Sequence, residues 1–80
     1  MIEMQIAMIK RSAKDLGDDK AAVRGSAAGY FLTDDFENFC KENALPHKHW
    51  MESVQKIIKE DGVRKKKLIG NFLKEVKEFL

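Results

Sequence analysis

The sequence predicts an all-α fold, a small compact bundle of four to five helices, and three observations carry this prediction. First, apolar residues recur three and four positions apart through most of the chain, which is the spacing of one helix face. Second, no segment alternates polar and apolar residues with the period of a strand. Third, 80 residues with 44 % hydrophobic and 35 % charged side chains suffice for one small soluble domain and for no second core. We therefore expect residues 1–80 to form a single helical domain.

The first helix is expected over residues 2–16, and Gly17 is expected to end it. Its apolar side chains at helical spacing are Ile2, Ile6, Ile9 and Leu16, together with Met4, Met8 and Ala13. Its basic side carries Lys10, Arg11 and Lys14. The helix is also rich in methionine, with Met1, Met4 and Met8. Flexible thioethers pack adaptably, so these side chains suit either a core or a protein partner.

Residues 18–32 have the least regular pattern. Asp18 or Asp19 is expected to cap a helix here. Gly25 and Gly29 each destabilise that helix by about 1 kcal/mol relative to alanine, although small residues also suit a close crossing of two helices. We expect a short helix, continuous or broken, that leads into three core side chains, Tyr30, Phe31 and Leu32.

The most specific pattern is a pair of helices over residues 33–61. The hydroxyl of Thr33 is expected to cap the first helix. Acidic residues that suit the positive end of the helix dipole follow it, namely Asp34, Asp35 and Glu37. The predicted inward side chains are Phe36, Phe39 and Cys40. Asn43 is expected to end this helix, because asparagine tolerates left-handed backbone conformations.

The second helix of the pair is expected to begin at Pro46, since proline suits the first position of a helix. Its predicted inward side chains are Trp50, Val54, Ile57 and Ile58. Gly62 is expected to end it in a left-handed conformation.

The last helix is expected over residues 63–80. It carries a wide apolar stripe, made of Leu68, Ile69, Phe72, Leu73, Val76, Phe79 and Leu80. Either the rest of the chain or a second copy must cover this stripe, so a homodimer is one expectation.

Residues 36–55 resemble the helix-turn-helix motif, in which a bracing helix supports a second helix that enters the major groove of DNA. Phe39 and Cys40 supply the apolar and small residues of the bracing helix. Ala44 and Ser53 depart from the motif, because glycine is commonest at the turn and an apolar residue is expected in place of the serine.

The resemblance implies a recognition helix over about residues 46–60. The side chains expected to donate hydrogen bonds to phosphates or base edges are His47, Lys48, His49 and Gln55. A basic cluster follows, Arg64, Lys65, Lys66 and Lys67. Because this cluster opposes the dipole at the start of a helix, contact with phosphate or with an acidic protein surface would favour it. A solvated run of charge is the alternative.

No residues combine into a catalytic or metal site. His47 and His49 are two positions apart and point in different directions on a helix. Cys40 falls on an apolar face, where a thiol is usually inert. We therefore expect a protein that is not an enzyme and that needs no metal and no cofactor.

The single cysteine excludes an intramolecular disulfide and favours a reducing compartment. The chain shows no secretory leader and nothing close to the roughly 20 apolar residues of a membrane span. We expect a cytoplasmic protein with no membrane partner.

Two functions remain. In the first, the protein is a DNA-binding regulator of helix-turn-helix type, dimeric in form, with residues 46–60 in the groove and 64–67 on the phosphate backbone. In the second, it is a protein–protein interaction module, such as an adaptor, an inhibitor or an antitoxin-like partner, that binds through the first or the last helix. The net charge of +2 neither requires nor excludes nucleic acid.

Overall fold

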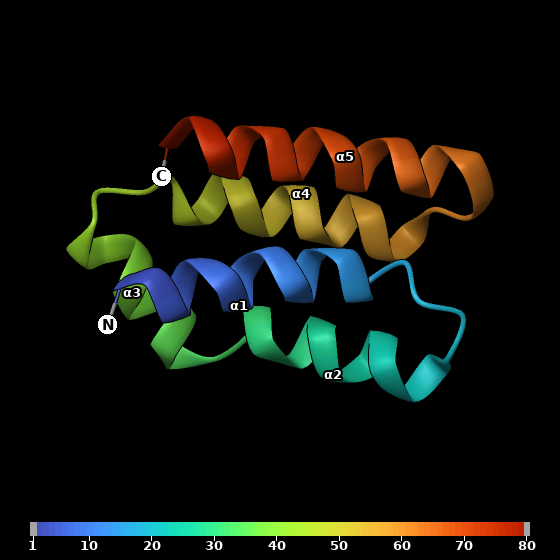
Figure 1. Ribbon diagram of the computed structural model, residues 1–80, viewed down its shortest axis with the longest axis horizontal. Helices are drawn as coiled ribbons and strands as arrows, with labels where there is room; N and C mark the ends of the chain where they lie inside the picture. Colours follow the sequence, from blue (N-terminus) through green and yellow to red (C-terminus); the bar gives the residue numbers. More distant parts are fainter. Residues whose placement is uncertain (1, 80) are drawn as a thin grey trace.

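The computed structural model describes residues 2–79, and its secondary structure is entirely helical (Figure 1). The helices are α1 (Ile2–Asp15), α2 (Ala21–Phe31), α3 (Asp34–Glu42), α4 (His47–Lys59) and α5 (Gly62–Phe79). The predicted all-α bundle, with its pair of helices inside residues 33–61, is therefore confirmed. Predictions for Met1, for Leu80 and for the side chain of Ile2 lie outside what the structure describes.

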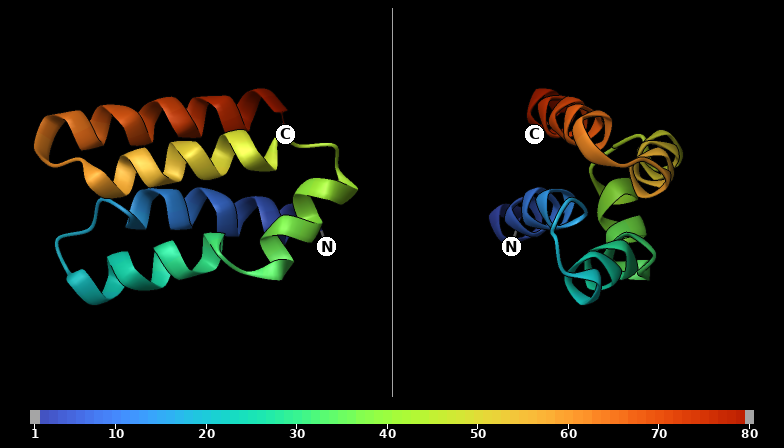
Figure 2. Two further views of the ribbon diagram at one scale, coloured as in Figure 1. Left: turned by 180° about the vertical axis from the view of Figure 1, so that it is seen from behind. Right: turned by 90° about the vertical axis from the view of Figure 1, so that its right-hand side faces the viewer.

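Two antiparallel hairpins, α1–α2 and α4–α5, lie side by side, and α3 crosses one end of the bundle to connect them (Figures 1 and 2). α1 packs against α2 and α5, while α4 packs against α5 and α2. The apolar stripe of α5 is thus covered largely by the chain itself, between α1 and α4. The two hairpin turns lie together at the end of the bundle opposite α3 (Figure 1).

All five helices contribute to one hydrophobic cluster. Its buried side chains are Ile9, Ala13, Leu16, Ala27, Phe31, Phe36, Phe39, Cys40, Trp50, Val54, Ile57, Ile69, Phe72 and Val76. Aromatic rings form its centre, since Phe31 packs edge to face on Phe36 at 5.0 Å and on Phe72 at 6.0 Å. Trp50 packs edge to face on Phe72 at 5.8 Å. Such pairs stabilise a fold by about 0.5–1.5 kcal/mol each beyond the area that they bury.

The connection between α3 and α4 follows the predicted pattern with two corrections. Thr33 caps α3, because its hydroxyl oxygen accepts a hydrogen bond of 3.3 Å from the Phe36 amide. The left-handed residue is Ala44, at φ 53°, and not Asn43. The Asn43 side-chain amide instead donates to the Phe39 carbonyl at 2.9 Å, which holds Asn43 at negative φ. Pro46 is the residue before the first turn of α4 and not the first helical residue.

The α4–α5 turn is as predicted at its central residue. Gly62 has a φ of +62°, a left-handed conformation that costs glycine little. The residue also begins α5, while Glu60 ends α4 in an extended conformation.

α2 is one continuous helix, so the alternative of a broken helix was wrong. Neither predicted aspartate caps it, because Lys20 occupies the cap position without a side-chain bond. Asp18 instead accepts a hydrogen bond of 2.8 Å from the Lys20 amide within the turn. Arg24 reaches back to the same turn and donates to the carbonyl oxygens of Asp18 at 2.7 Å and of Asp19 at 2.9 Å.

Three predicted core side chains, Leu32, Ile58 and Phe79, are exposed, and so are Met4 and Met8 of the first apolar face. Leu32 is 69 % exposed because it follows the end of α2 and points away from Phe31, which is buried. Ile58 is 43 % exposed, since it stands about 100° around α4 from the buried Ile57. Tyr30, the third predicted anchor of α2, is only half-buried.

None of the helices between Ile2 and Phe79 combines the length and the apolar composition needed to cross a bilayer.

Candidate nucleic-acid interface

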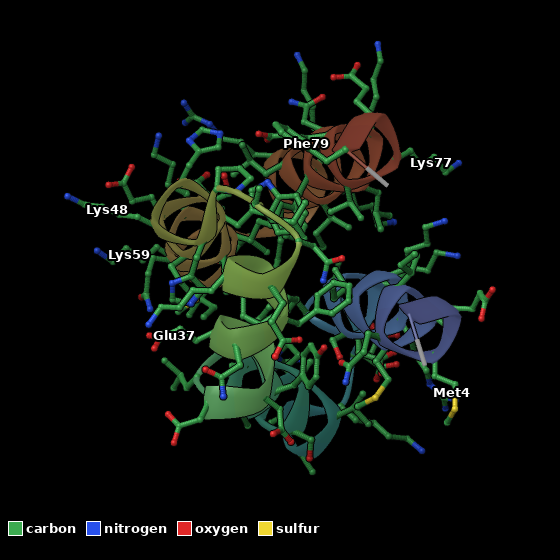
Figure 3. The ribbon with its side chains drawn as sticks, turned by 90° about the vertical axis from the view of Figure 1, so that its left-hand side faces the viewer. Met4, Glu37, Lys48, Lys59, Lys77 and Phe79 are labelled. Atoms are coloured by element: carbon green, nitrogen blue, oxygen red, sulfur yellow. The ribbon has the colours of Figure 1, made fainter. Side chains whose placement is uncertain are left out.

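The outer face of α4 is an open, shallow surface. It is lined by Lys48, Met51, Glu52, Gln55, Lys56 and Lys59. Lys48 and Lys59 project from α4 on the same side of the bundle (Figure 3). The side chains of Lys48, Lys56 and Lys59 have no carboxylate within 4 Å among residues 2–79. They are therefore the cations of α4 that are accessible to an external anion.

The two histidines at the start of α4 already have intramolecular partners. The His47 ring is half-buried and lies 5.5 Å from the Phe36 ring. His49 Nε2 lies 2.9 Å from Glu75 Oε1 on α5. Of the predicted donors on α4, Lys48 and Gln55 are thus exposed and unpaired within the described chain, whereas contact of DNA with His49 would compete with Glu75.

A groove with both polar and apolar lining runs between α4 and α5. One part, about 150 Å³ in volume, is lined by Ser53, Lys56, Leu68, Asn71, Phe72 and Glu75. The next part, about 270 Å³, is lined by Lys56, Lys59, Glu60, Arg64 and Leu68. Because both parts share Lys56 and Leu68, the groove is continuous towards the α4–α5 turn.

The predicted basic cluster does not form one surface, since successive residues of a helix point about 100° apart. Arg64 pairs with Glu60 at 3.5 Å beside the groove, although its side chain is 81 % exposed. Lys65 is half-buried and turns towards the α1–α2 turn, where it lines a polar hollow with Arg24 and Asp61. Lys66 and Lys67 are exposed.

The two predicted patches, the histidines at the start of α4 and the basic cluster of residues 64–67, lie far apart. α4 contains 13 residues, so a rise of 1.5 Å per residue separates its two ends by roughly 18 Å. The histidines lie at one end and the basic cluster adjoins the other. Lys56 and Lys59 occupy the space between them. Sequence reasoning assigned these two lysines no role, although their spacing of eight and eleven residues from Lys48 places all three on one helix face.

Charge is segregated among the helices. α5 has six basic and two acidic residues, a net charge of +4, and α4 has three basic and one acidic, a net +2. α3 has one basic and four acidic residues, a net −3, and it lies at the end of the bundle away from the α4–α5 turn (Figure 1). The small total charge of the chain therefore conceals a strongly basic hairpin.

Burial changes the acidity of two side chains, Cys40 and Tyr30. Burial raises the pKa of the Cys40 thiol to about 11, which keeps the thiolate nucleophile scarce at neutral pH. Burial, together with the charges of Cys40 and Asp35, raises the pKa of Tyr30. Residues 2–79 contain no cluster of three or more histidine, cysteine or acidic side chains arranged to hold a metal ion.

Comparison of the chain with protein-family models, with curated proteins and with solved structures finds no match. The interface is therefore argued from the chain itself.

Proposed function

We propose that this protein is a small non-enzymatic DNA-binding protein, a regulator in the cytoplasm, that contacts the phosphate backbone through the outer face of α4 and the adjoining start of α5. The observation that carries the proposal is the row Lys48, Lys56 and Lys59, which is exposed on one face and has no carboxylate partner within the described chain. Lysine contacts of this kind supply most of the affinity of sequence-independent DNA binding.

In this proposal few side chains are placed to recognise the edges of DNA bases. Gln55 lies within the lysine row and can hydrogen-bond an adenine edge. Glu52 lies on the same face and repels phosphate, so it favours an orientation in which it meets a cytosine amino group. Binding is therefore expected to depend more on backbone charge than on sequence.

The test is fluorescence anisotropy with a labelled random-sequence duplex over a series of salt concentrations. The test variant is Lys48→Gln/Lys56→Gln/Lys59→Gln. The matched control, Arg11→Gln/Lys20→Gln/Lys41→Gln, removes the same charge from α1, from the α1–α2 turn and from α3. The test variant should lower the slope of log affinity against log salt by about one for each lysine that contacts a phosphate. Equal losses in both variants, or no binding by the natural sequence at low salt, would overturn the proposal.

A protein partner is the second candidate, and one observation favours it. Met4 is 66 % exposed and Met8 is 47 % exposed on α1. Exposed apolar side chains on one helix are a common feature of protein-binding surfaces. A second copy of the chain is one such partner and would give the dimer that a symmetric DNA site requires. Light scattering of the natural sequence and of Met4→Gln/Met8→Gln tests this candidate, since a monomer in both cases removes the homodimer.

A further inference from the structure

A second set of lysines lies on the side of the bundle away from the outer face of α4. One flank of α5 faces α4, as the contact between Glu75 and His49 and the position of Leu68 in the groove establish. The opposite flank faces α1, because α5 packs between these two helices. At 100° per residue, the side chains on that opposite flank are Lys66, Leu73 and Lys77. Figure 3 shows Lys77 on the side of the bundle away from Lys48 and Lys59.

The matching flank of α1 is also basic. Gln5 marks the flank that faces α2, because its side-chain oxygen accepts a hydrogen bond of 3.4 Å from the Tyr30 hydroxyl. Lys10 stands about 140° further around the helix, and Lys14 is one turn beyond it. Since the neighbours of α1 are α2 and α5, these two lysines lie on the flank beside α5.

The antiparallel register places the two sets of lysines together. A Cβ on Gly17 would lie 2.8 Å from Ile69 Cδ1, so the end of α1 is level with Ile69. Counting back along α1 and forward along α5 places Lys10 and Lys14 at the level of residues 72–76. We call the resulting surface the α1–α5 lysine face, and its members are Lys10, Lys14, Lys66 and Lys77.

The α1–α5 lysine face has little opposing charge. None of its lysines has a carboxylate within 4 Å among residues 2–79. Glu3 lies about two turns before Lys10, beyond the level of the end of α5. Glu78 follows Lys77 and Asp15 follows Lys14, and each of these acidic residues stands about 100° around its helix from that lysine. Four like charges on one face favour a polyanionic partner.

We propose that the α1–α5 lysine face binds the phosphate backbone of a second DNA segment, so that one molecule bridges two duplexes. This inference rests on the proposed function, because the first duplex is held by the outer face of α4. The bundle measures 33 × 23 × 20 Å between its outermost Cα atoms, so two duplexes on opposite sides would be separated by the whole thickness of the protein. Their mutual repulsion is then screened over roughly two and a half to three Debye lengths at physiological salt, each of about 8 Å.

An anionic membrane is a less suitable partner for this face. Binding of a helix at a bilayer surface needs large apolar side chains that enter the acyl region. Met4 and Met8 are exposed on α1, but they stand on the flank beside α2 and not among the lysines. Leu73, between the lysines, is packed against the core.

The test is a bridging assay. A biotinylated duplex on beads is incubated with the protein and with a fluorescent duplex, and the captured fluorescence is measured. The test variant is Lys10→Gln/Lys14→Gln/Lys77→Gln, and the α4 variant Lys48→Gln/Lys56→Gln/Lys59→Gln serves as its counterpart. We expect the natural sequence to capture the second duplex. Each variant should lose about tenfold or more of the captured duplex, yet still bind a single duplex in anisotropy.

The outcomes separate the two proposals. No binding of a single duplex by the natural sequence overturns the proposed function itself. Binding of a single duplex without capture of the second overturns only the bridging inference. Undiminished capture by the Lys10, Lys14 and Lys77 variant also overturns it, since bridging would then come from the α4 faces of two associated copies. Capture of vesicles of anionic phospholipid, without capture of a second duplex, would assign this face to a membrane instead.

Discussion

His49 and Glu75 join the start of α4 to the second half of α5, with His49 Nε2 2.9 Å from Glu75 Oε1. The two residues are 26 positions apart in the sequence, and Glu75 also lines the groove between α4 and α5. His49 is 58 % exposed at its side chain and Glu75 is 27 % exposed. The contact is therefore partly screened by solvent, and its contribution to stability should be small.

The first prediction concerns this pair. A double-mutant cycle of His49→Ala and Glu75→Ala should give a coupling free energy of about 0.2–1 kcal/mol from urea unfolding. A cycle on Arg11 and Asp15, whose atoms are 3.9 Å apart on the surface of α1, is the control and should give a coupling near zero. Equal coupling free energies in the two cycles would show that the His49–Glu75 contact between helices contributes no more than a surface pair within one helix.

The second prediction concerns Phe79, which is 51 % exposed and packs edge to face on Trp50 at 5.9 Å. Trp50 is fully buried and is the single tryptophan of the chain, so its fluorescence reports on this end of the core. Phe79→Ala should shift the emission of Trp50 to longer wavelength and lower the free energy of unfolding by about 1–2 kcal/mol. Val63→Ala is the matched control, since Val63 is an apolar residue of α5 that is 84 % exposed. An emission maximum that Phe79→Ala leaves unchanged would show that the ring does not cover Trp50.

The third prediction concerns the glycines of α2. A Cβ added to Gly25 or Gly29 would meet no atom within 4 Å outside its own helix backbone. Gly25→Ala and Gly29→Ala should therefore each raise the free energy of unfolding by about 0.5–1 kcal/mol, because alanine favours the helix. The midpoint of thermal unfolding should rise by about 4–8 °C for each kcal/mol.

Gly62→Ala is the control for the glycine prediction. The added methyl group there meets no atom within 4 Å either, but the residue has a φ of +62°. A left-handed conformation costs alanine about 1–2 kcal/mol, so Gly62→Ala should lower the stability. If all three substitutions change the stability in the same direction, the conformations of α2 and of the α4–α5 turn are not as described.

The local sequence pattern predicted the helices well, but it did not predict which faces of the helices pack against each other. The Thr33 cap and the inward spacing of Trp50, Val54 and Ile57 depend on residues within one or two turns, so the sequence alone sufficed to predict them. The interface was harder to predict. The contact of His49 with Glu75 depends on which flank of α5 faces α4, and no local pattern encodes that choice.

The sequence analysis did not predict the α1–α5 lysine face, because this surface also depends on which helices are neighbours. Lys10 and Lys14 are one turn apart on α1, and Lys66 and Lys77 are three turns apart on α5. Neither row is unusual on a solvated helix. They become one surface only when α1 and α5 are known to be antiparallel neighbours.

The fourth prediction concerns Cys40 and pH. Burial raises the pKa of its thiol from an ordinary 9.0 to about 11. Between these two values the unfolded chain loses the thiol proton while the folded protein keeps it. The stability that this difference contributes is fully present below pH 9 and is lost as the pH rises towards 11. The raised pKa of Tyr30 acts in the same direction. The urea midpoint should therefore fall between pH 9 and pH 11.

Cys40→Ala separates the contribution of the thiol from that of the other groups. The substitution creates a small cavity in the core and lowers the stability at every pH. The fall in stability between pH 9 and pH 11 should nevertheless become shallower, because only the raised pKa of Tyr30 then contributes to it. A thiol reagent offers an independent measurement, since the buried Cys40 should react at pH 8 only when urea unfolds the chain. Rapid reaction in the native protein, or an equally steep fall in stability without the thiol, would place Cys40 outside the core.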